Sequence, residues 1–245
     1  MSNPLKTKEK TPTLLVFGGF ERAARVLELV KPSIPIIAAS FDYPFSPPRR
    51  FEFPQSFRHA PEAKRAVQDT LKGIRLLKSY LHQRPDVNKT QTLILGASFG
   101  APFALAAAAE DPDITGVILI HGFAQIPETL EQRLAQRLQP RFGLLGEVLA
   151  KLVTSIGWWY LEAPSPEESI ANLKSHQRVL MVSAEKDNLL PKTSVDALWH
   201  SLEHSQAQVE RVQTNGDHIQ AGASSLIKEV SGLVTQWMKT HRLAP

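Results

Sequence analysis

The sequence Gly96-Ala97-Ser98-Phe99-Gly100 decides the fold, because it joins a predicted strand to a predicted helix through a sharp turn. The mainly apolar residues 92–95 precede it, and the alanine-rich residues 102–109 follow it. A strand, a tight turn carrying serine and a helix in that order form a nucleophile elbow, which presents the serine hydroxyl beyond the sheet. The flanking glycines leave room where side chains would collide with the neighbouring helix and strand. Ser98 is therefore our candidate nucleophile.

Length and composition indicate one large α/β domain or two small ones. The chain has 245 residues, of which 42% are hydrophobic and 21% are charged, as in ordinary globular proteins. It contains no cysteine, which excludes disulfides and thiolate metal sites. The polar N-terminus lacks the apolar segment of a signal peptide, and no apolar run is long enough to span a bilayer. We therefore expect a cytoplasmic protein without stable membrane insertion.

The net charge of +4 is spread along the chain and forms no dense basic stripe. Nucleic-acid binding proteins concentrate their basic residues on one face, so we expect no nucleic-acid partner. The sequence leaves the oligomeric state open.

Apolar runs alternate with helical patterns along nearly the whole chain. Continuous apolar strands that alternate with helices are typical of a parallel sheet covered on both faces. We predict a three-layer α/β/α sandwich with a mainly parallel sheet of about six strands. Residues 1–12 are expected to form a tail, residues 13–245 the domain, and residues 123–176 a helical cap insertion without strands. The predicted strands are 14–17, 34–39, 93–95, 116–120, 178–183 and 209–213, and the predicted helices include 21–30, 61–81, 192–202 and 222–241.

A serine, an acid and a histidine each follow a predicted strand, in that order. Ser98 follows the third strand, Asp187 the fifth and His218 the sixth. Ligands bind at the carboxyl ends of parallel strands, so these side chains are expected to meet there. Asp217 and Glu185 are competing candidates for the acid. No histidine and acid pair has metal-ligand spacing, so we expect neither a metal nor a cofactor.

The order and surroundings of these motifs resemble the α/β-hydrolase superfamily from about residue 13 to residue 240. Residues 184–191 resemble its acid turn, although Ala184 stands where glycine is commoner. Residues 215–218 are similar to its histidine loop, residues 18–20 to its oxyanion turn, and residues 42–44 to the loop after its next strand. The two antiparallel strands that open the family fold have no room before residue 13.

The resemblance implies a catalytic triad. Ser98 would be the nucleophile, His218 the general base and acid, and Asp187 the group that orients the imidazole. The backbone N–H groups of Phe20 and Phe99 would form the oxyanion hole. The candidates for the substrate pocket are Gly19, His121, Trp158 and Trp159.

These assignments predict a serine hydrolase that cleaves a carboxylic ester, or a thioester, through an acyl-enzyme on Ser98. The expected partner is a small to medium, partly apolar, ester-like molecule. An acyltransferase or thioesterase using the same triad, or a non-catalytic binding module on the same scaffold, remains an alternative. The apolar segment 144–161 would pack on the domain, wall the substrate pocket, or form a partner-binding or interfacial patch.

Overall fold

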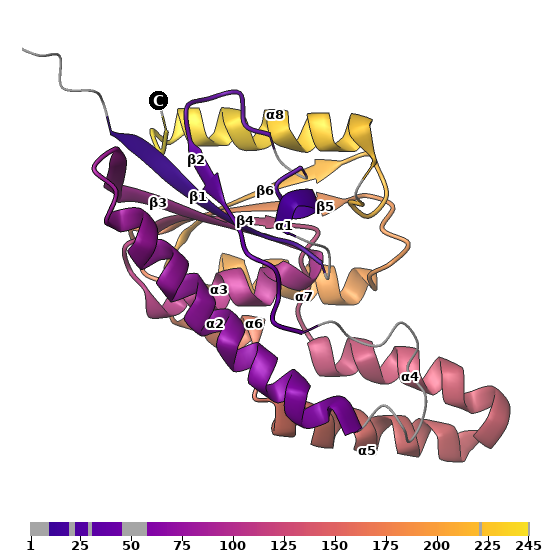
Figure 1. The fold of residues 1–245 in the computed structure, drawn as a ribbon. Coiled ribbons are helices and arrows are strands. Elements are labelled where there is room, and N and C mark those ends of the chain that lie inside the picture. Colours follow the sequence, from indigo (N-terminus) through magenta and orange to yellow (C-terminus); the bar gives the residue numbers. More distant parts are fainter. Residues whose placement is uncertain (1–9, 20–22, 29–30, 46–57, 221, 245) are drawn as a thin grey trace, which may run out of the picture.

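The computed structural model describes residues 10–19, 23–28, 31–45, 58–220 and 222–244, which form a three-layer α/β/α sandwich (Figure 1). Its middle layer is a sheet of six parallel strands in the order β2-β1-β3-β4-β5-β6. The fold class predicted from the sequence is confirmed. The strands are β1 (Thr11–Phe17), β2 (Ile37–Ala39), β3 (Val87–Ala97), β4 (Ile114–Ile120), β5 (Arg178–Ala184) and β6 (Gln208–Thr214).

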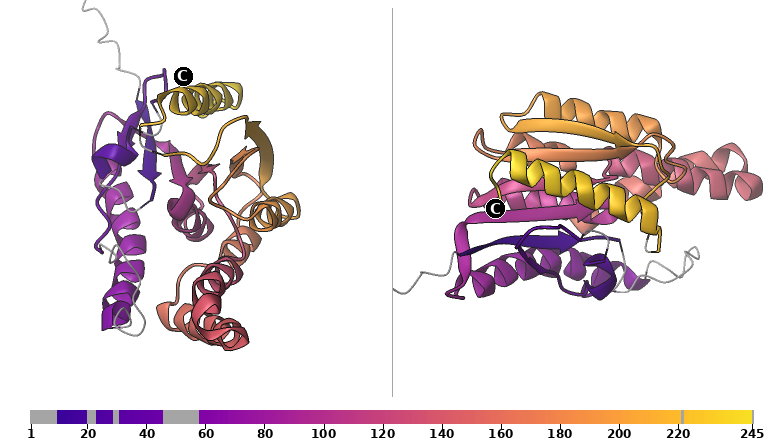
Figure 2. Two further views of the ribbon diagram at one scale, coloured as in Figure 1. Left: turned by 90° about the vertical axis from the view of Figure 1, so that its right-hand side faces the viewer. Right: turned by 90° about the horizontal axis from the view of Figure 1, so that it is seen from above.

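Each face of the sheet buries its own apolar core. In β1, Leu14 and Val16 point into one core while Leu15 and Phe17 point into the other, as the two-residue period of a strand requires. Helix α8 (Ser224–Thr240) and the short α1 (Ala23–Val26) cover the first face. The second face is covered by α2 (Ala60–His82), α3 (Ala101–Glu110), α6 (Pro166–Ala171) and α7 (Lys192–Glu203) (Figure 2).

The strand order places the site at the carboxyl ends of the strands, beside β1 and β3. The chain runs from β1 to its neighbour β2 on one side and then returns to β3 on the other side of β1. At such a reversal the loops leave the sheet in opposite directions and open a crevice beyond the carboxyl ends of the strands. Ser98 follows β3 directly, so it lies beside this crevice.

Helices α4 (Ile126–Phe142) and α5 (Leu144–Leu161) form an antiparallel pair that projects away from the sandwich (Figures 1 and 2). They lie between β4 and β5, where the sequence predicts a helical insertion without strands. Helix α6, also in that insertion, packs instead on α3 and α7 within the sandwich. No helix in the described part of the chain has both the length and the apolarity needed to cross a membrane.

Several element boundaries differ from those predicted. Strand β1 begins at Thr11, inside the expected tail, and residues 1–9 lie outside the described residues. Strand β2 starts at residue 37 rather than 34, because Pro35 lacks the N–H that a strand position donates. Strand β3 starts six residues earlier than predicted, with a largely polar first half that carries no apolar pattern. Of the helix predicted at 21–30, the described residues contain only Ala23–Val26.

Candidate active site

The turn after β3 holds Ser98 in a backbone conformation that L residues rarely adopt. Its φ is +50°, in the left-handed region. The turn is crowded: a Cβ on Gly96 would lie 2.6 Å from the Cα of Ala101, and one on Gly100 would lie 2.3 Å from the carbonyl oxygen of Phe17. Only glycine fits at both positions. The surrounding strand and helix thus impose the strained conformation of Ser98, as functional sites often require.

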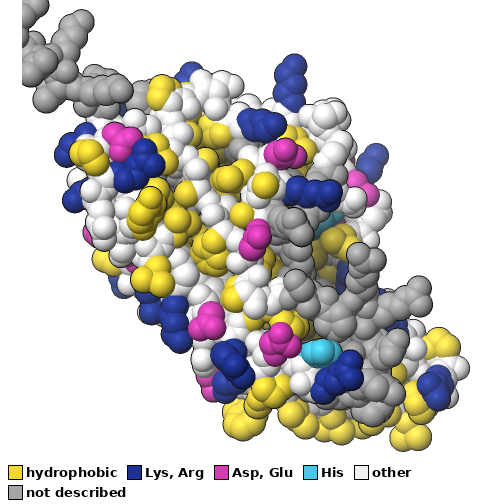
Figure 3. All heavy atoms as spheres, viewed as in Figure 1, with side chains coloured by type: hydrophobic (Ala, Val, Ile, Leu, Met, Phe, Trp, Pro, Cys, Tyr) yellow, Lys and Arg dark blue, Asp and Glu magenta, His cyan; other side chains and the backbone are white. Residues whose placement is uncertain are grey.

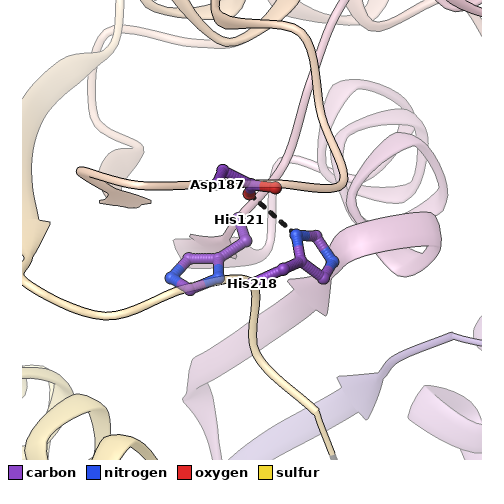
Figure 4. A group of neighbouring side chains, drawn as sticks. All are labelled: His121, Asp187 and His218. Atoms are coloured by element: carbon purple, nitrogen blue, oxygen red, sulfur yellow. Dashed lines mark hydrogen bonds and ion pairs between the residues drawn. The ribbon is translucent and has the colours of Figure 1, made fainter.

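Three side chains from three separate loops form a continuous hydrogen-bonded chain. Nε2 of His218 lies 2.9 Å from Oγ of Ser98, and Nδ1 of the same ring lies 2.8 Å from Oδ2 of Asp187. The histidine and aspartate side chains are only 4% and 7% exposed. Figure 4 shows the Asp187 carboxylate directed at the near edge of the His218 ring. A serine, an imidazole and a carboxylate in this sequence can move a proton from the hydroxyl to the ring.

The Asp187 carboxylate stays ionised although it is largely buried. Burial alone would raise its pKa, but the hydrogen bonds from His218 and from the N–H groups of Leu189 and Leu190 outweigh burial and keep the pKa below its usual value. Oδ1 accepts both backbone N–H groups, at 2.9 and 2.8 Å, which leaves Oδ2 for the ring. The ring is therefore expected to carry its proton on Nδ1 and to present a bare Nε2 to Ser98.

Asp217, the competing acid, faces away from the histidine ring. Its Oδ1 accepts the N–H groups of Asn188 and His218, at 2.9 and 2.7 Å, and its Oδ2 accepts the side-chain amide of Asn188 at 2.9 Å. These hydrogen bonds lower the pKa of Asp217 and fasten the histidine loop to the acid loop. Glu185, the other competitor, is exposed on the same loop as Asp187.

His121 lies behind His218 rather than along an open pocket. It is 1% exposed, its ring centre is 5.4 Å from that of His218, and its Nδ1 accepts the N–H of Ile219 at 2.8 Å. Burial, followed by the nearby His218, lowers the pKa of His121 to about 4. It is therefore a neutral ring that supports the backbone next to His218.

His121, Asp187 and His218 also form a cluster of potential metal ligands whose donor atoms lie within 4.8 Å of one another. Both ring nitrogens of His218 already have partners, and Nδ1 of His121 accepts a backbone N–H. A metal would have to displace several of these hydrogen bonds. The arrangement therefore suits proton transfer better than metal coordination.

Several solved structures that share this architecture are described as esterases or hydrolases. An esterase from Thermogutta terrifontis is 14% identical with a TM-score of 0.61, covering 98% of this chain and 87% of its own. A putative dienelactone hydrolase from Klebsiella pneumoniae is 14% identical with a TM-score of 0.61, covering 97% and 90%. An acetyl xylan esterase from a Thermoanaerobacterium species is 17% identical with a TM-score of 0.53, covering 94% and 76%. This chain has the α/β-hydrolase fold. No family model and no curated protein sequence matches it.

In the α/β-hydrolase fold one oxyanion donor follows the nucleophile and the other lies in the loop after the third strand. The resemblance assigns these roles to Phe99 and to Phe20, which follows the first strand of this chain. Phe20 lies outside the described residues. Phe99 is the residue after Ser98, in the middle of the one-turn helix η2 (Ser98–Gly100) that leads into α3. At Gly19, a predicted pocket residue, an added Cβ would meet no described atom within 4 Å, and Gly19 lines neither of the two apolar cavities near the site.

Tyr43 is a site residue that the sequence analysis did not single out. Its hydroxyl donates to the carbonyl oxygen of Gly18 at 2.9 Å, and burial raises its pKa well above the usual value. Its ring packs edge-on against Phe99, with ring centres 5.8 Å apart. The preceding Asp42 accepts the N–H of Ala23 at 2.6 Å. This loop therefore braces the turn after β1 against the nucleophile turn; its sequence signal was the resemblance of residues 42–44.

Two apolar cavities lead from the α/β-hydrolase body into the α4–α5 pair. The inner cavity, about 270 Å³, is walled by Tyr43, Phe99, Phe103 and Phe123, and Phe99 is the residue that follows Ser98 in the chain. The outer cavity, about 450 Å³, lies between α2, α4 and α5. Trp158 lines both cavities.

Trp159, the other predicted pocket tryptophan, lines neither cavity and is 79% exposed. Consecutive helical residues point about 100° apart, and on α5 this offset turns Trp159 toward solvent while Trp158 faces the cavities. The expectation that both tryptophans line one pocket is therefore wrong for Trp159.

Helix α4 is tied directly to the acid loop. The Arg133 guanidinium donates to the carbonyl oxygen of Leu189, whose own N–H is bound by Asp187. Near the start of α4, the N–H of Gln125 donates to the Glu167 carboxylate at 2.8 Å. The projecting pair is thereby fastened to the site at its base.

Proposed function

We propose that this protein is a serine hydrolase that cleaves carboxylic esters through an acyl-enzyme on Ser98. The observation that carries the proposal is the Ser98–His218–Asp187 hydrogen-bonded chain, with distances of 2.9 and 2.8 Å. The strained backbone of Ser98 and the esterases among the solved structures with this fold support it.

The proposed reaction begins with attack of Ser98 Oγ on the ester carbonyl carbon while Nε2 of His218 takes the hydroxyl proton. The tetrahedral intermediate collapses, the C–O bond to the alcohol breaks, and the histidine returns the proton to the leaving oxygen. Water then attacks the acyl-enzyme, giving its proton to the same nitrogen. Collapse of the second intermediate releases the carboxylic acid, and the proton returns to Ser98.

Asp187 acts by charge and orientation. The imidazolium that forms in each step lies against a carboxylate kept ionised by two backbone N–H groups. The negative charge on the carbonyl oxygen is proposed to meet the N–H groups of Phe99 and Phe20. Loss of one such donor typically costs about 3 kcal/mol of transition-state stabilisation.

The inner cavity supports a substrate with an apolar acyl or alcohol group of small to medium size. Its wall includes Phe99, the residue after the proposed nucleophile, and consists mainly of aromatic and aliphatic side chains. Helices α4 and α5 are proposed to act as the cap over it, since Trp158 and Leu130 contribute to its wall. Such a wall excludes water around the reacting carbonyl and favours apolar chains by their burial.

The test is covalent labelling with a fluorophosphonate, in which Ser98 Oγ bonds to phosphorus and fluoride leaves. We expect the wild-type protein and Ser225→Ala, altered at an exposed serine of α8, to be labelled equally. Ser98→Ala should take no label and should lose hydrolysis of p-nitrophenyl butyrate. A folded wild-type protein that takes no label and hydrolyses no ester in a panel from acetate to dodecanoate would refute the proposal and favour the binding-module alternative.

A further inference from the structure

Helix α5 exposes a continuous apolar stripe on the side away from the cavities. Six large apolar residues of this helix are between 53% and 79% exposed. Figure 3 shows hydrophobic atoms gathered along the lower edge of the molecule, over α5. The stripe consists of Leu144, Leu145, Val148, Leu152, Ile156 and Trp159.

The stripe is separate from the proposed substrate site. At about 100° per residue, Leu145, Val148, Leu152, Ile156 and Trp159 fall within roughly 80° of one another around the helix. The cavity-lining residues Val153, Thr154 and Trp158 lie on other sides of the same helix. Burial of a substrate therefore leaves the stripe exposed.

The exposed area is that of a specific interface rather than of an ordinary surface. Aromatic side chains bury roughly 150–250 Å² each. With the aliphatic side chains taken near the lower end of that range, the six residues at their exposed fractions present on the order of 700 Å². The largest apolar patch on a monomeric protein is usually about 300–600 Å². A stable interface buries about 800 Å² on each partner, so the stripe nearly supplies one side of such an interface.

The spacing of the stripe is symmetric about its central residue. Leu145 and Trp159 lie seven residues before and after Leu152, and Val148 and Ile156 lie four residues before and after it. A twofold axis beside Leu152 would bring a second, antiparallel α5 into register, with an apolar residue opposite each apolar residue. Self-complementarity of this kind is what an isologous dimer interface requires.

We propose that the occupant of this stripe is a second copy of the chain, bound through antiparallel pairing of the two α5 helices. A lipid surface is the less suitable occupant, because helices that lie in a membrane interface carry a polar face rich in lysine and arginine. Helix α5 has one lysine, Lys151, and one acid, Glu147, so it carries no net charge. Its side opposite the stripe packs within the protein, where residues such as Val153 and Trp158 line the outer cavity.

The pairing is tested by sedimentation velocity over roughly 1–100 μM protein, a range that detects micromolar dissociation constants. The wild type should sediment as a particle of twice 27.2 kDa. Leu152→Glu puts two like charges together at the axis and should raise the dissociation constant at least about 100-fold. The control Leu76→Glu alters a leucine on α2 that lies outside the stripe and is more exposed than Leu152 (71% against 53%), and it should leave the dimer intact.

Circular dichroism checks that both variants are folded. A wild type that stays at 27.2 kDa over the whole range would overturn the proposal, as would a folded Leu152→Glu that remains dimeric. Monomeric wild type that floats with phosphatidylcholine–phosphatidylserine vesicles would assign the stripe to a lipid surface instead.

The register is tested by cross-linking, because the chain has no cysteine of its own. Leu152→Cys should form a covalent dimer when copper phenanthroline and oxygen oxidise the paired thiols. Leu145→Cys alone should not, whereas a mixture of Leu145→Cys and Trp159→Cys should give the mixed dimer. Efficient self-cross-linking of Leu145→Cys would indicate parallel helices and refute the antiparallel arrangement.

Discussion

Replacing Asp187 with asparagine should disable the proposed site through one reversed hydrogen bond. Oδ1 of Asp187 accepts the N–H groups of Leu189 and Leu190, so in the variant the amide oxygen keeps that position. The NH₂ group is then forced to face Nδ1 of His218, 2.8 Å away in the wild type, and an NH₂ group can only donate. The ring must move its proton to Nε2, which then points a hydrogen at Ser98 and cannot accept one.

The expected loss in kcat/KM is about 10⁴-fold, as for an equivalent tautomer reversal in serine proteases. That factor corresponds to roughly 5.5 kcal/mol of transition-state stabilisation. The assay is p-nitrophenyl butyrate hydrolysis at pH 7.5, with thermal unfolding to verify that the variant is folded. The matched control is Asp217→Asn, since Asp217 contacts the backbone of His218 but not its ring.

We expect Asp217→Asn to lose roughly tenfold or less, because it weakens the loop contacts and leaves the tautomer unchanged. If Asp187→Asn keeps more than about a tenth of the wild-type activity, the tautomer argument fails. Equal losses of activity in the two variants would show that both carboxylates act by holding the loops in place and not by setting the position of the ring proton.

Three further predictions concern packing, pH and the pocket. Gly100→Ala should destabilise the protein by about 1–3 kcal/mol or prevent folding, because its Cβ would lie 2.3 Å from a β1 carbonyl oxygen. The control Gly157→Ala should not destabilise the protein, because its Cβ would meet no described atom within 4 Å. Urea unfolding measures the stability of both variants. His121 has a folded pKa of about 4, below its ordinary 6.5, so its neutral form stabilises the fold fully above pH 6.5 and this contribution declines as the pH falls toward 4. The free energy of unfolding should fall by about 3 kcal/mol over this pH range in the wild type, and this fall should be absent from His121→Gln. Equal dependence of the unfolding free energy on pH in the two proteins would contradict the prediction. Trp158→Ala should shift the ester preference toward longer acyl chains by roughly tenfold, while Trp159→Ala, altered outside both cavities, should leave the preference unchanged.

The sequence predicts those parts of the molecule that follow a regular pattern. Continuous apolar runs identify the inner strands of the sheet, because strands buried on both faces carry few polar residues. Ser98 and Asp187 could be proposed together with His218 since each follows a predicted strand. The glycines at 96 and 100 could be explained in advance, because the close approaches they permit are local to the turn.

The rest depends on orientation, which the chain order does not determine. Asp187 and Asp217 both stand in loops at the same sheet edge, and only three-dimensional geometry distinguishes the one that reaches the ring. Trp158 and Trp159 differ only in helical phase. The contact of Arg133 with the carbonyl oxygen of Leu189 joins residues 56 positions apart on separate elements, and Arg133 belongs to no recognisable motif.

The backbone of Leu189 contacts both Asp187 and helix α4. Its N–H binds the carboxylate that orients the imidazole, and its carbonyl oxygen accepts the arginine of α4. A displacement of α4 large enough to admit a bulky molecule would pull on this carbonyl and so on the loop that holds Asp187. The position of α4 and the position of the loop that carries Asp187 are therefore linked through the backbone of this one residue.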